Sequence, residues 1–106
     1  MTIAEVLEMT VMLTGEDIAH SVLQRFVREL EGRILVEIHG EENADGVGEV
    51  LCVPAPYDGI YWTYLVYMLA MYHGGSKELC ERYGAAFQRA YDAYSHYYRT
   101  RVGGGS

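Results

Sequence analysis

The chain has 106 residues, 15 of them acidic and 8 basic, and a net charge of −7 at neutral pH, which suits one small domain. The charge is uneven: residues 1–58 hold twelve acidic residues and three arginines (−9), whereas residues 59–106 hold three acidic and five basic residues (+2). Such a chain lacks the clustered Lys and Arg that binding to nucleic acid or to an anionic membrane surface requires, so both are excluded as main functions.

The first predicted helix covers about residues 3–13. Thr2-x-x-Glu5 matches a capping box, in which each side chain satisfies a free backbone N–H group of the other residue. Because the start of the chain is acidic and has no positively charged segment, it is not a signal peptide. The two cysteines, Cys52 and Cys80, do not form a disulfide framework. We therefore expect an intracellular protein.

A second helix is predicted over about residues 16–39, with Thr14-x-x-Asp17 as its N-cap. Apolar residues recur there at every fourth position, which is typical of a helix with one buried face: Ile18, Val22, Phe26, Leu30 and Ile34. The charged residues are placed mainly on the opposite, solvent-facing side: Arg25, Arg28, Glu29, Glu31 and Arg33. Gly32 is a mildly unfavourable residue inside this helix.

Residues 40–55 are acidic and rich in glycine, and they predict a loop that is long for a domain of this size. Residues 50–53 have the pattern of a short extended piece. Glu41-x-Asn43-x-Asp45-Gly46 resembles the beginning of an EF-hand calcium loop, but the twelfth position falls on Cys52, which cannot replace the bidentate Glu. A solvated acidic loop is therefore the favoured interpretation.

The next segment predicts a third helix that begins near Pro56 and ends at Gly74-Gly75. Asp58 is the single charged residue between these ends, so the helix is apolar on all sides and should be covered on all sides. As a helix, its apolar part, residues 60–72, would be about 20 Å long, which is too short for the roughly 30 Å of a hydrocarbon core. A membrane span is excluded on this ground.

Ser76 is the expected N-cap of a fourth helix, whose apolar residues form one stripe: Leu79, Tyr83, Phe87, Tyr91, Tyr94 and Tyr98. The chain is thus predicted to be all-α, with four helices in a single domain over residues 1–102 and a flexible Gly/Ser tail over residues 103–106. The third and fourth helices should form an αα-hairpin, and the long loop should join the second helix to the third.

The ten tyrosines, one tryptophan and two phenylalanines exceed what one small core can bury. We assign five residues to the core of the subunit: Tyr61, Leu65, Phe87, Tyr91 and Tyr94. Because Tyr and Trp are enriched at the centres of interfaces, we assign four others to contacts between copies of the chain: Trp62, Tyr64, Tyr67 and Met71.

Catalytic motifs such as GxSxG and HExxH are absent from the sequence, and we expect neither an enzyme nor a cofactor. Two carboxylate–histidine pairs, Asp17-x-x-His20 and Asp92-x-x-x-His96, could each offer two metal ligands. The pattern brings no further ligand to them, His73 included. Ordinary surface pairs are the favoured interpretation, and a metal-dependent enzyme that uses them is the least favoured hypothesis.

Three segments resemble motifs of the head–tail connector proteins (also called adaptor or head-completion proteins) of tailed phages and prophages. Residues 51–67, LCVPAPYDGIYWTYLVY, resemble the family's "LLVPxPYDxLYxxYL" stretch; residues 87–101, FQRAYDAYSHYYRTR, resemble its "FNxAYxxFxxYYNRTH" ending; and residues 28–34, RELEGRI, resemble its "xELDGRI". The opening MTIAEVLEM is also similar. The chain departs from the pattern at Gly59 and Cys80, and the match is weakest over residues 40–50 and 77–84.

This resemblance implies a structural virion protein that does no chemistry. Copies of the chain would form a ring, twelvefold in the expected case, beneath the portal protein. The ring would extend the DNA channel, through which DNA passes non-specifically, and join the capsid to a neck, tail-completion or stopper protein. Its place would be the neck of the virion, after assembly in the cytoplasm of the bacterial host.

Two groups of charged residues acquire expected roles in such a ring. The acidic loop residues would face the channel and repel phosphates: Glu41, Glu42, Asp45 and Glu49. Arg99 and Arg101 would bind an acidic surface of the portal protein. The alternative hypothesis from the same sequence is a small acidic helical phage regulator that binds a host protein and never forms a ring.

Overall fold

The computed structural model of the chain describes residues 1–14 and 20–103, and it confirms the all-α fold. Four α-helices follow in chain order within these residues: α1 (Ile3–Thr14), α2 (His20–Glu37), α3 (Gly59–Tyr72) and α4 (Lys77–Tyr98). One π-helical turn, η1 (Arg99–Gly103), continues α4. Asp17 of the predicted second N-cap and residues 104–106 of the predicted tail lie outside the described residues.

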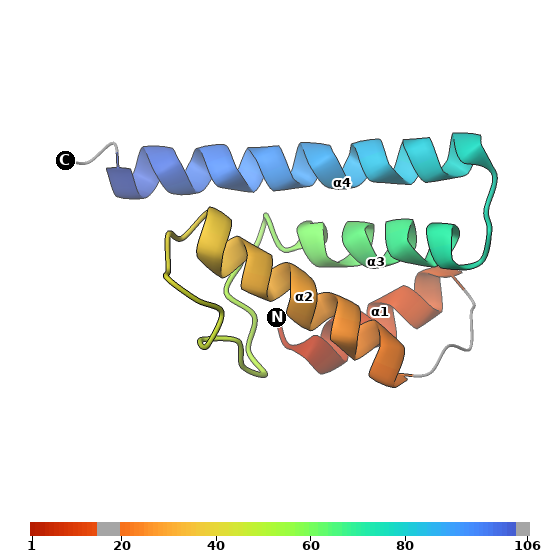
Figure 1. The fold of residues 1–106 in the computed structure, drawn as a ribbon, viewed down its shortest axis with the longest axis horizontal. Helices are drawn as coiled ribbons and strands as arrows, with labels where there is room; N and C mark the ends of the chain where they lie inside the picture. Colours follow the sequence, from red (N-terminus) through yellow and green to blue (C-terminus); the bar gives the residue numbers. More distant parts are fainter. Residues whose placement is uncertain (15–19, 104–106) are drawn as a thin grey trace.

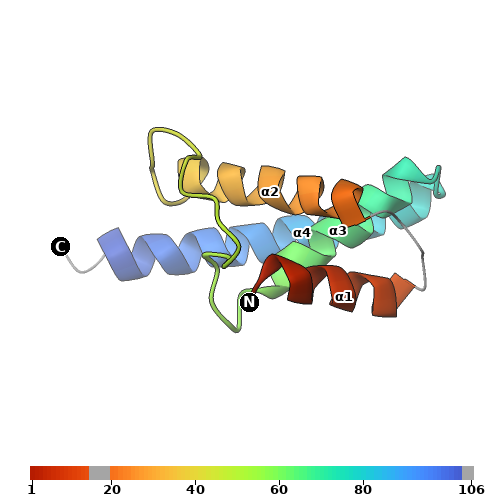
Figure 2. The same cartoon turned by 90° about the horizontal axis from the view of Figure 1, so that it is seen from below.

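The helices are arranged in three layers (Figure 1). α3 lies in the middle, with α4 antiparallel to it on one side and with α1 and α2 on the other. Seen from below, α1 and α2 lie on either side of α3, which is visible between them, and α4 runs behind (Figure 2). The short connection 73–76 joins α3 to α4, so the predicted αα-hairpin is confirmed. Because α4 has 22 residues and α3 only 14, the second half of α4 extends past the start of α3.

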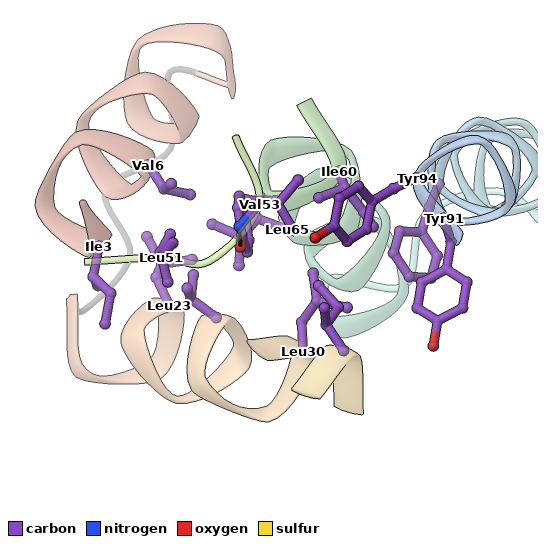
Figure 3. Packing of buried hydrophobic residues seen from close by; sticks show 14 of the residues in the cluster. Ile3, Val6, Leu23, Leu30, Leu51, Val53, Ile60, Leu65, Tyr91 and Tyr94 are labelled. Carbon is purple, nitrogen blue, oxygen red and sulfur yellow. Dashed lines mark hydrogen bonds between the residues drawn. The ribbon is translucent and has the colours of Figure 1, made fainter. Parts of the chain in front are cut away.

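Every layer contributes side chains to one hydrophobic core (Figure 3). They come from α1, α2, the connection between α2 and α3, α3 and α4, and include Ile3, Val6, Leu23, Leu30, Leu51, Val53, Ile60, Leu65, Tyr91 and Tyr94. The five residues that the sequence assigns to the core are all buried: Tyr61, Leu65, Phe87, Tyr91 and Tyr94. Burial of each such side chain contributes about 1.5–3 kcal/mol to stability, and this core fixes the position of α3.

Two predicted helix starts have the expected caps. The Thr2 N–H group donates to Glu5 Oε1 at 3.3 Å, and the Glu5 N–H group donates to Thr2 Oγ1 at 3.2 Å, so the capping box at α1 is confirmed. At α4 the Leu79 N–H group donates to Ser76 Oγ at 3.2 Å. Both helices therefore begin where short-range sequence signals place them.

The long loop begins at a glycine turn and then returns to the core. Gly40 has a φ of 76°, a conformation that favours glycine, and the Glu41 N–H group donates to the Leu35 carbonyl at 3.0 Å. Further along, the Ile3 N–H group donates to the Glu49 carbonyl at 3.1 Å, which forms an antiparallel bridge between the loop and the start of α1. The predicted extended piece at residues 50–53 therefore packs against the rest of the domain, with Leu51 and Val53 buried.

The third helix begins later than the sequence predicts. Residues 55–58 form a turn, in which the Tyr57 N–H group donates to the Pro54 carbonyl at 2.9 Å, and α3 starts at Gly59. Asp58 occupies the N-cap position but makes no side-chain capping bond. The prediction of a start near Pro56 is wrong because this turn keeps Pro56 outside the helix.

Candidate interaction surface

α3 carries apolar side chains on all its faces, but its own chain covers them unevenly. Ile60, Tyr61, Leu65 and Leu69 are buried. The remaining large apolar side chains stay half-buried or exposed: Trp62, Tyr64, Val66, Tyr67, Met68, Met71 and Tyr72. The prediction that α3 is covered on all sides is therefore wrong for a single copy, since the layers lie above and below α3 and leave its flanks uncovered.

One flank of α3 forms an apolar groove beside Trp62, which we call the Trp62 groove. It encloses about 280 Å³ and is lined by Pro56, Tyr57, Gly59, Ile60, Trp62, Thr63, Ala90 and Ala93. The α4 wall consists of alanines, which leave room for a side chain from elsewhere. The groove is closed on its core side by Ile60, which is completely buried.

Gly59 explains how the indole of Trp62 is placed. A Cβ atom on Gly59 would lie 3.2 Å from Trp62 Nε1, which is tighter than ordinary packing. Gly59 therefore lets the indole lie back over the first turn of α3. Because Gly59 has no side chain, it leaves space along the wall of the Trp62 groove.

A second groove lies at the end of the hairpin. It encloses about 370 Å³ and is lined by Tyr67, Met71, Lys77, Cys80, Glu81 and Gly84. Tyr67 packs closely on α4, since a Cβ atom on Gly84 would lie 3.0 Å from its Cε1 atom. Met71 is 53% exposed. Lys77 and Glu81 on its rim form an exposed pair 4.0 Å apart, so this groove has no unbalanced charge.

The four predicted interface residues thus differ in their surroundings. Tyr64 faces α4 within its own chain, where its ring centre lies 4.9 Å from that of Phe87, and burial raises the pKa of its hydroxyl. Tyr67 also contacts α4. Trp62 and Met71 line open grooves and leave most room for a partner.

A buried carboxylate joins three elements at the centre of the molecule. Glu31 of α2 is 2% exposed. Its Oε2 atom accepts a bond from the Cys52 N–H group at 2.7 Å, and its Oε1 atom accepts one from the Tyr61 hydroxyl at 2.7 Å. The same hydroxyl accepts a bond from the Val53 N–H group at 2.9 Å. We call these residues the Glu31 cluster; it ties the returning loop to α2 and α3.

The placement of Glu31 on the solvent side of its helix is wrong. Glu31 follows Leu23 and Val27 at four-residue spacing and precedes Leu35 at the same spacing, and all three are buried. The sequence did contain a signal for this burial, because Glu31 stands in a stripe whose other residues are apolar. It could not be interpreted alone, because the donors that satisfy it lie 21 and 30 residues away.

The Glu31 cluster suppresses the acidity of its neighbours. Burial, together with the bond to the Glu31 carboxylate, raises the pKa of the Cys52 thiol to about 12. Burial likewise raises the pKa of the Tyr61 hydroxyl far above its ordinary value, with the Glu31 carboxylate adding to the effect. Both groups therefore stay protonated at neutral pH and act as hydrogen-bond partners, not as nucleophiles.

A second polar contact joins α2 to α4 near the surface. The Tyr91 hydroxyl donates to Glu37 Oε1 at 2.6 Å, and Arg33 Nε donates to the same oxygen at 3.1 Å. These bonds, that of Tyr91 first, lower the pKa of the Glu37 carboxyl. The Arg33 guanidinium also lies 4.7 Å from the centre of the Tyr91 ring. The contact therefore links α4 to the C-terminal end of α2.

The C-terminal half of α4 carries an aromatic cluster. His39 Nε2 lies 2.7 Å from the Tyr94 hydroxyl, and its ring stacks on that of Tyr98 at 4.2 Å between centres. Tyr57 stacks on Tyr97 at 4.6 Å. Burial lowers the pKa of His39. These contacts anchor the overhanging end of α4 to the residues that flank the long loop.

The predicted charged sites lie on the surface. The acidic loop residues are all exposed: Glu41, Glu42, Asp45 and Glu49. Asn43 Oδ1 accepts a bond from the Asp45 N–H group at 2.9 Å, so the EF-hand-like segment uses this oxygen in a local turn. Arg99 and Arg101 are exposed on η1, and the Arg101 guanidinium lies 5.8 Å from the centre of the Tyr97 ring.

The described residues bring no metal site together. No group of three or more His, Cys, Asp or Glu side chains among them is arranged to hold a metal ion. Of the carboxylate–histidine pairs, Asp17 lies outside the described residues, and Asp92 accepts a bond from Gln88 Nε2 at 3.0 Å. Within the same part of the chain, no helix has the length and hydrophobicity needed to cross a membrane.

Comparisons with protein-family models, with curated proteins and with solved structures found no match to this chain.

Proposed function

We propose that the chain is a head–tail connector of a tailed phage or prophage, a structural subunit that forms a ring beneath the portal protein. The observation that carries this proposal is α3, an apolar helix of which the single chain buries only one face. A helix with uncovered apolar flanks, Trp62 on one and Met71 on the other, suits a subunit that meets a neighbour on each side.

The three segments with family resemblance support the same proposal because they meet in space. Glu31, in residues 28–34, bonds to Cys52 and Tyr61, which lie in residues 51–67. The ring of Tyr94, in residues 87–101, lies 6.0 Å from that of Tyr57. The resembling residues thus form one packing unit, as expected for motifs that specify a fold.

Charge also agrees with this function. The acidic loop is exposed, and carboxylates on a channel wall would let DNA slide without binding. Arg99 and Arg101 are exposed on η1 and remain our proposed contact with the portal protein. The proposed location is accordingly the neck of the virion, with the portal and a neck or stopper protein as partners.

The experiment that tests this function is native mass spectrometry of the full chain co-expressed with the portal protein of the same phage or prophage. We expect one portal ring that carries an integral ring of this chain, and the mass gives the copy number. A chain that remains a small oligomer and never joins a portal ring contradicts the proposal. That result would favour the regulator, for which the uncovered flank of α3 would bind a host protein.

A further inference from the structure

The Trp62 groove accepts an apolar side chain and offers little to a polar one. Its lining residues are apolar or small apart from Thr63. The Thr63 hydroxyl already bonds to the carbonyl groups of Gly59 and Ile60, at 3.0 Å each. A flexible, unbranched side chain that contacts the indole face would fill this groove best, and methionine has these properties.

Two exposed charges on α4 lie beside the groove, Arg89 and Asp92, and the Asp92 carboxylate accepts a bond from Gln88 Nε2 at 3.0 Å. Arg89 is exposed on α4, one residue before Ala90 and one helical turn before Ala93. Within the described part of the chain, no salt bridge or hydrogen bond engages its guanidinium group. The partner that fills the groove should therefore place a carboxylate about one helical turn from its apolar side chain.

The outer face of α1 presents this combination. Met12 is 85% exposed, the highest value among the large apolar side chains of the described residues. It lies one helical turn after Glu8, and together with Met1, Glu5 and Met9 these residues line a shallow surface. Glu5 is occupied by the capping box, whereas no ion pair involves Glu8 among the described residues.

We propose that the Trp62 groove of one copy binds the α1 face of the next copy, with Met12 in the groove and Glu8 facing Arg89. The inference rests on the proposed ring and assigns the surface that meets the Trp62 flank; the Met71 flank lies outside this contact. α1 belongs to the layer below α3 (Figure 1), whereas the groove is lined by residues of α3, of the turn before it and of α4. Two different surfaces on one subunit give a head-to-tail contact, the type that closes into rings.

The charges around the groove also fix the direction of docking. Ring contacts between Tyr64 and Phe87 and between Tyr57 and Tyr97 define the antiparallel register of α3 and α4. In this register Arg89 lies toward the Trp62 end of the groove, and Asp58 lies at the opposite end. Glu8 is attracted to the first end and repelled from the second, so one orientation of α1 is favoured.

Disulfide cross-linking within the portal complex tests the contact directly. We would introduce Met12→Cys and Ala93→Cys together in a Cys80→Ser background and retain Cys52, which is half-buried in the Glu31 cluster. Oxidation should produce a ladder of covalent multimers that rises to the copy number of the ring. The pair Met12→Cys with Gln88→Cys is the matched control, because Gln88 lies on α4 away from the groove, and it should give monomers.

A charge exchange tests the pairing without cysteines. Arg89→Glu and Glu8→Arg should each weaken the contact about fivefold and lower the fraction of the chain in rings, and the double variant should restore it. All these positions are exposed, so circular dichroism should be unchanged.

The outcomes separate this inference from the proposed function. A portal-bound ring that shows neither the cross-linked ladder nor the charge rescue overturns the inference and leaves the connector function standing. Covalent dimers without higher multimers indicate a symmetric contact and also overturn it. If no ring forms with the portal protein, both proposals fail.

Discussion

The Glu31 cluster and the Trp62 groove lie on opposite sides of the same helix and differ in an instructive way. The first is polar but complete: Glu31 is 2% exposed, and its oxygens accept bonds from Cys52 and Tyr61. Among the described residues, no buried side-chain N or O atom lacks a partner. The second is apolar but open, with Trp62 half-buried and a wall of alanines opposite.

The difference indicates how one short helix would serve both folding and the assembly that we propose. The polar groups of the Glu31 cluster already bond to one another. The cluster therefore stabilises the fold and has no group left to bind a partner. An open apolar groove costs free energy in the single copy, because its surface stays in contact with water. Substitutions at the two places should therefore have opposite signatures: loss of stability at Glu31 and loss of assembly at Trp62.

The largest effect is expected for Glu31→Ala. The change leaves the Cys52 N–H group and the Tyr61 hydroxyl buried without an acceptor. We expect a loss of about 3 kcal/mol in the free energy of unfolding, measured by urea denaturation. Glu29→Ala is the matched control on the same helix. Glu29 pairs with Arg25 at 3.4 Å on the surface, so this variant should lose less than about 0.5 kcal/mol. Equal losses would show that the Glu31 cluster is not a special feature of the fold.

The second largest effect concerns the reactivity of Cys52. Because its thiol pKa is raised to about 12, almost no thiolate exists at pH 8 in the folded chain. In a Cys80→Ser background, labelling with a thiol-specific disulfide reagent should be at least about a hundredfold slower than in the same chain unfolded in urea. Adding Glu31→Ala to the folded Cys80→Ser chain should restore much of the labelling rate of Cys52. Fast labelling of the folded Cys80→Ser chain would mean that the loop opens often and that the cluster does not hold it.

The opposite signature is expected for Trp62→Ala. Since Trp62 is only half-buried, its removal should cost about 1 kcal/mol in the free energy of unfolding. Assembly with the portal protein should be lost, as measured by native mass spectrometry. Tyr72→Ala provides the control, because Tyr72 is 65% exposed but lies outside both grooves. If Trp62→Ala unfolds the chain instead, Trp62 belongs to the core and the interface lies elsewhere.

The same contrast explains which features could be predicted from the sequence. The helices, the caps at Thr2 and Ser76 and the tyrosine stripe of α4 depend on residues three or four apart, which a local pattern contains. The role of Glu31 depends on donors far along the chain. The uncovered flank of α3 depends on how the layers stack, which no periodicity encodes.

The start of α3 and the Trp62 groove show a finer limit. Pro56 is a favourable first residue for a helix, yet the turn at residues 55–58 shifts the start to Gly59. The aromatic content predicts an interface, and the structure places Trp62 on an open groove. The sequence does not predict that the groove involves Ala90, Ala93 and Arg89. Small and charged residues on a long helix can be assigned to a surface only when the element that faces them is known.

The smallest predicted effect concerns the contact of Glu37 with Tyr91 and Arg33, which is polar but only partly shielded from solvent. The bonds from Tyr91 and Arg33 lower the pKa of Glu37 in the folded state below its ordinary value of 4.5. The folded state therefore holds the Glu37 proton less tightly than the unfolded state does. The resulting stabilisation is present above about pH 4.5 and is lost as the pH falls through the lower, folded pKa.

Half of the Glu37 side chain is exposed, so solvent screening keeps the contribution small. We would measure urea midpoints between pH 7 and pH 3 for the parent, for Glu37→Gln and for Tyr91→Phe. Both variants should show a shallower loss of stability with acid than the parent. A parallel pH dependence in all three would assign the acid sensitivity to other carboxylates. The bond between α2 and α4 would then be a surface contact, and the Glu31 cluster would remain a polar link that the fold requires.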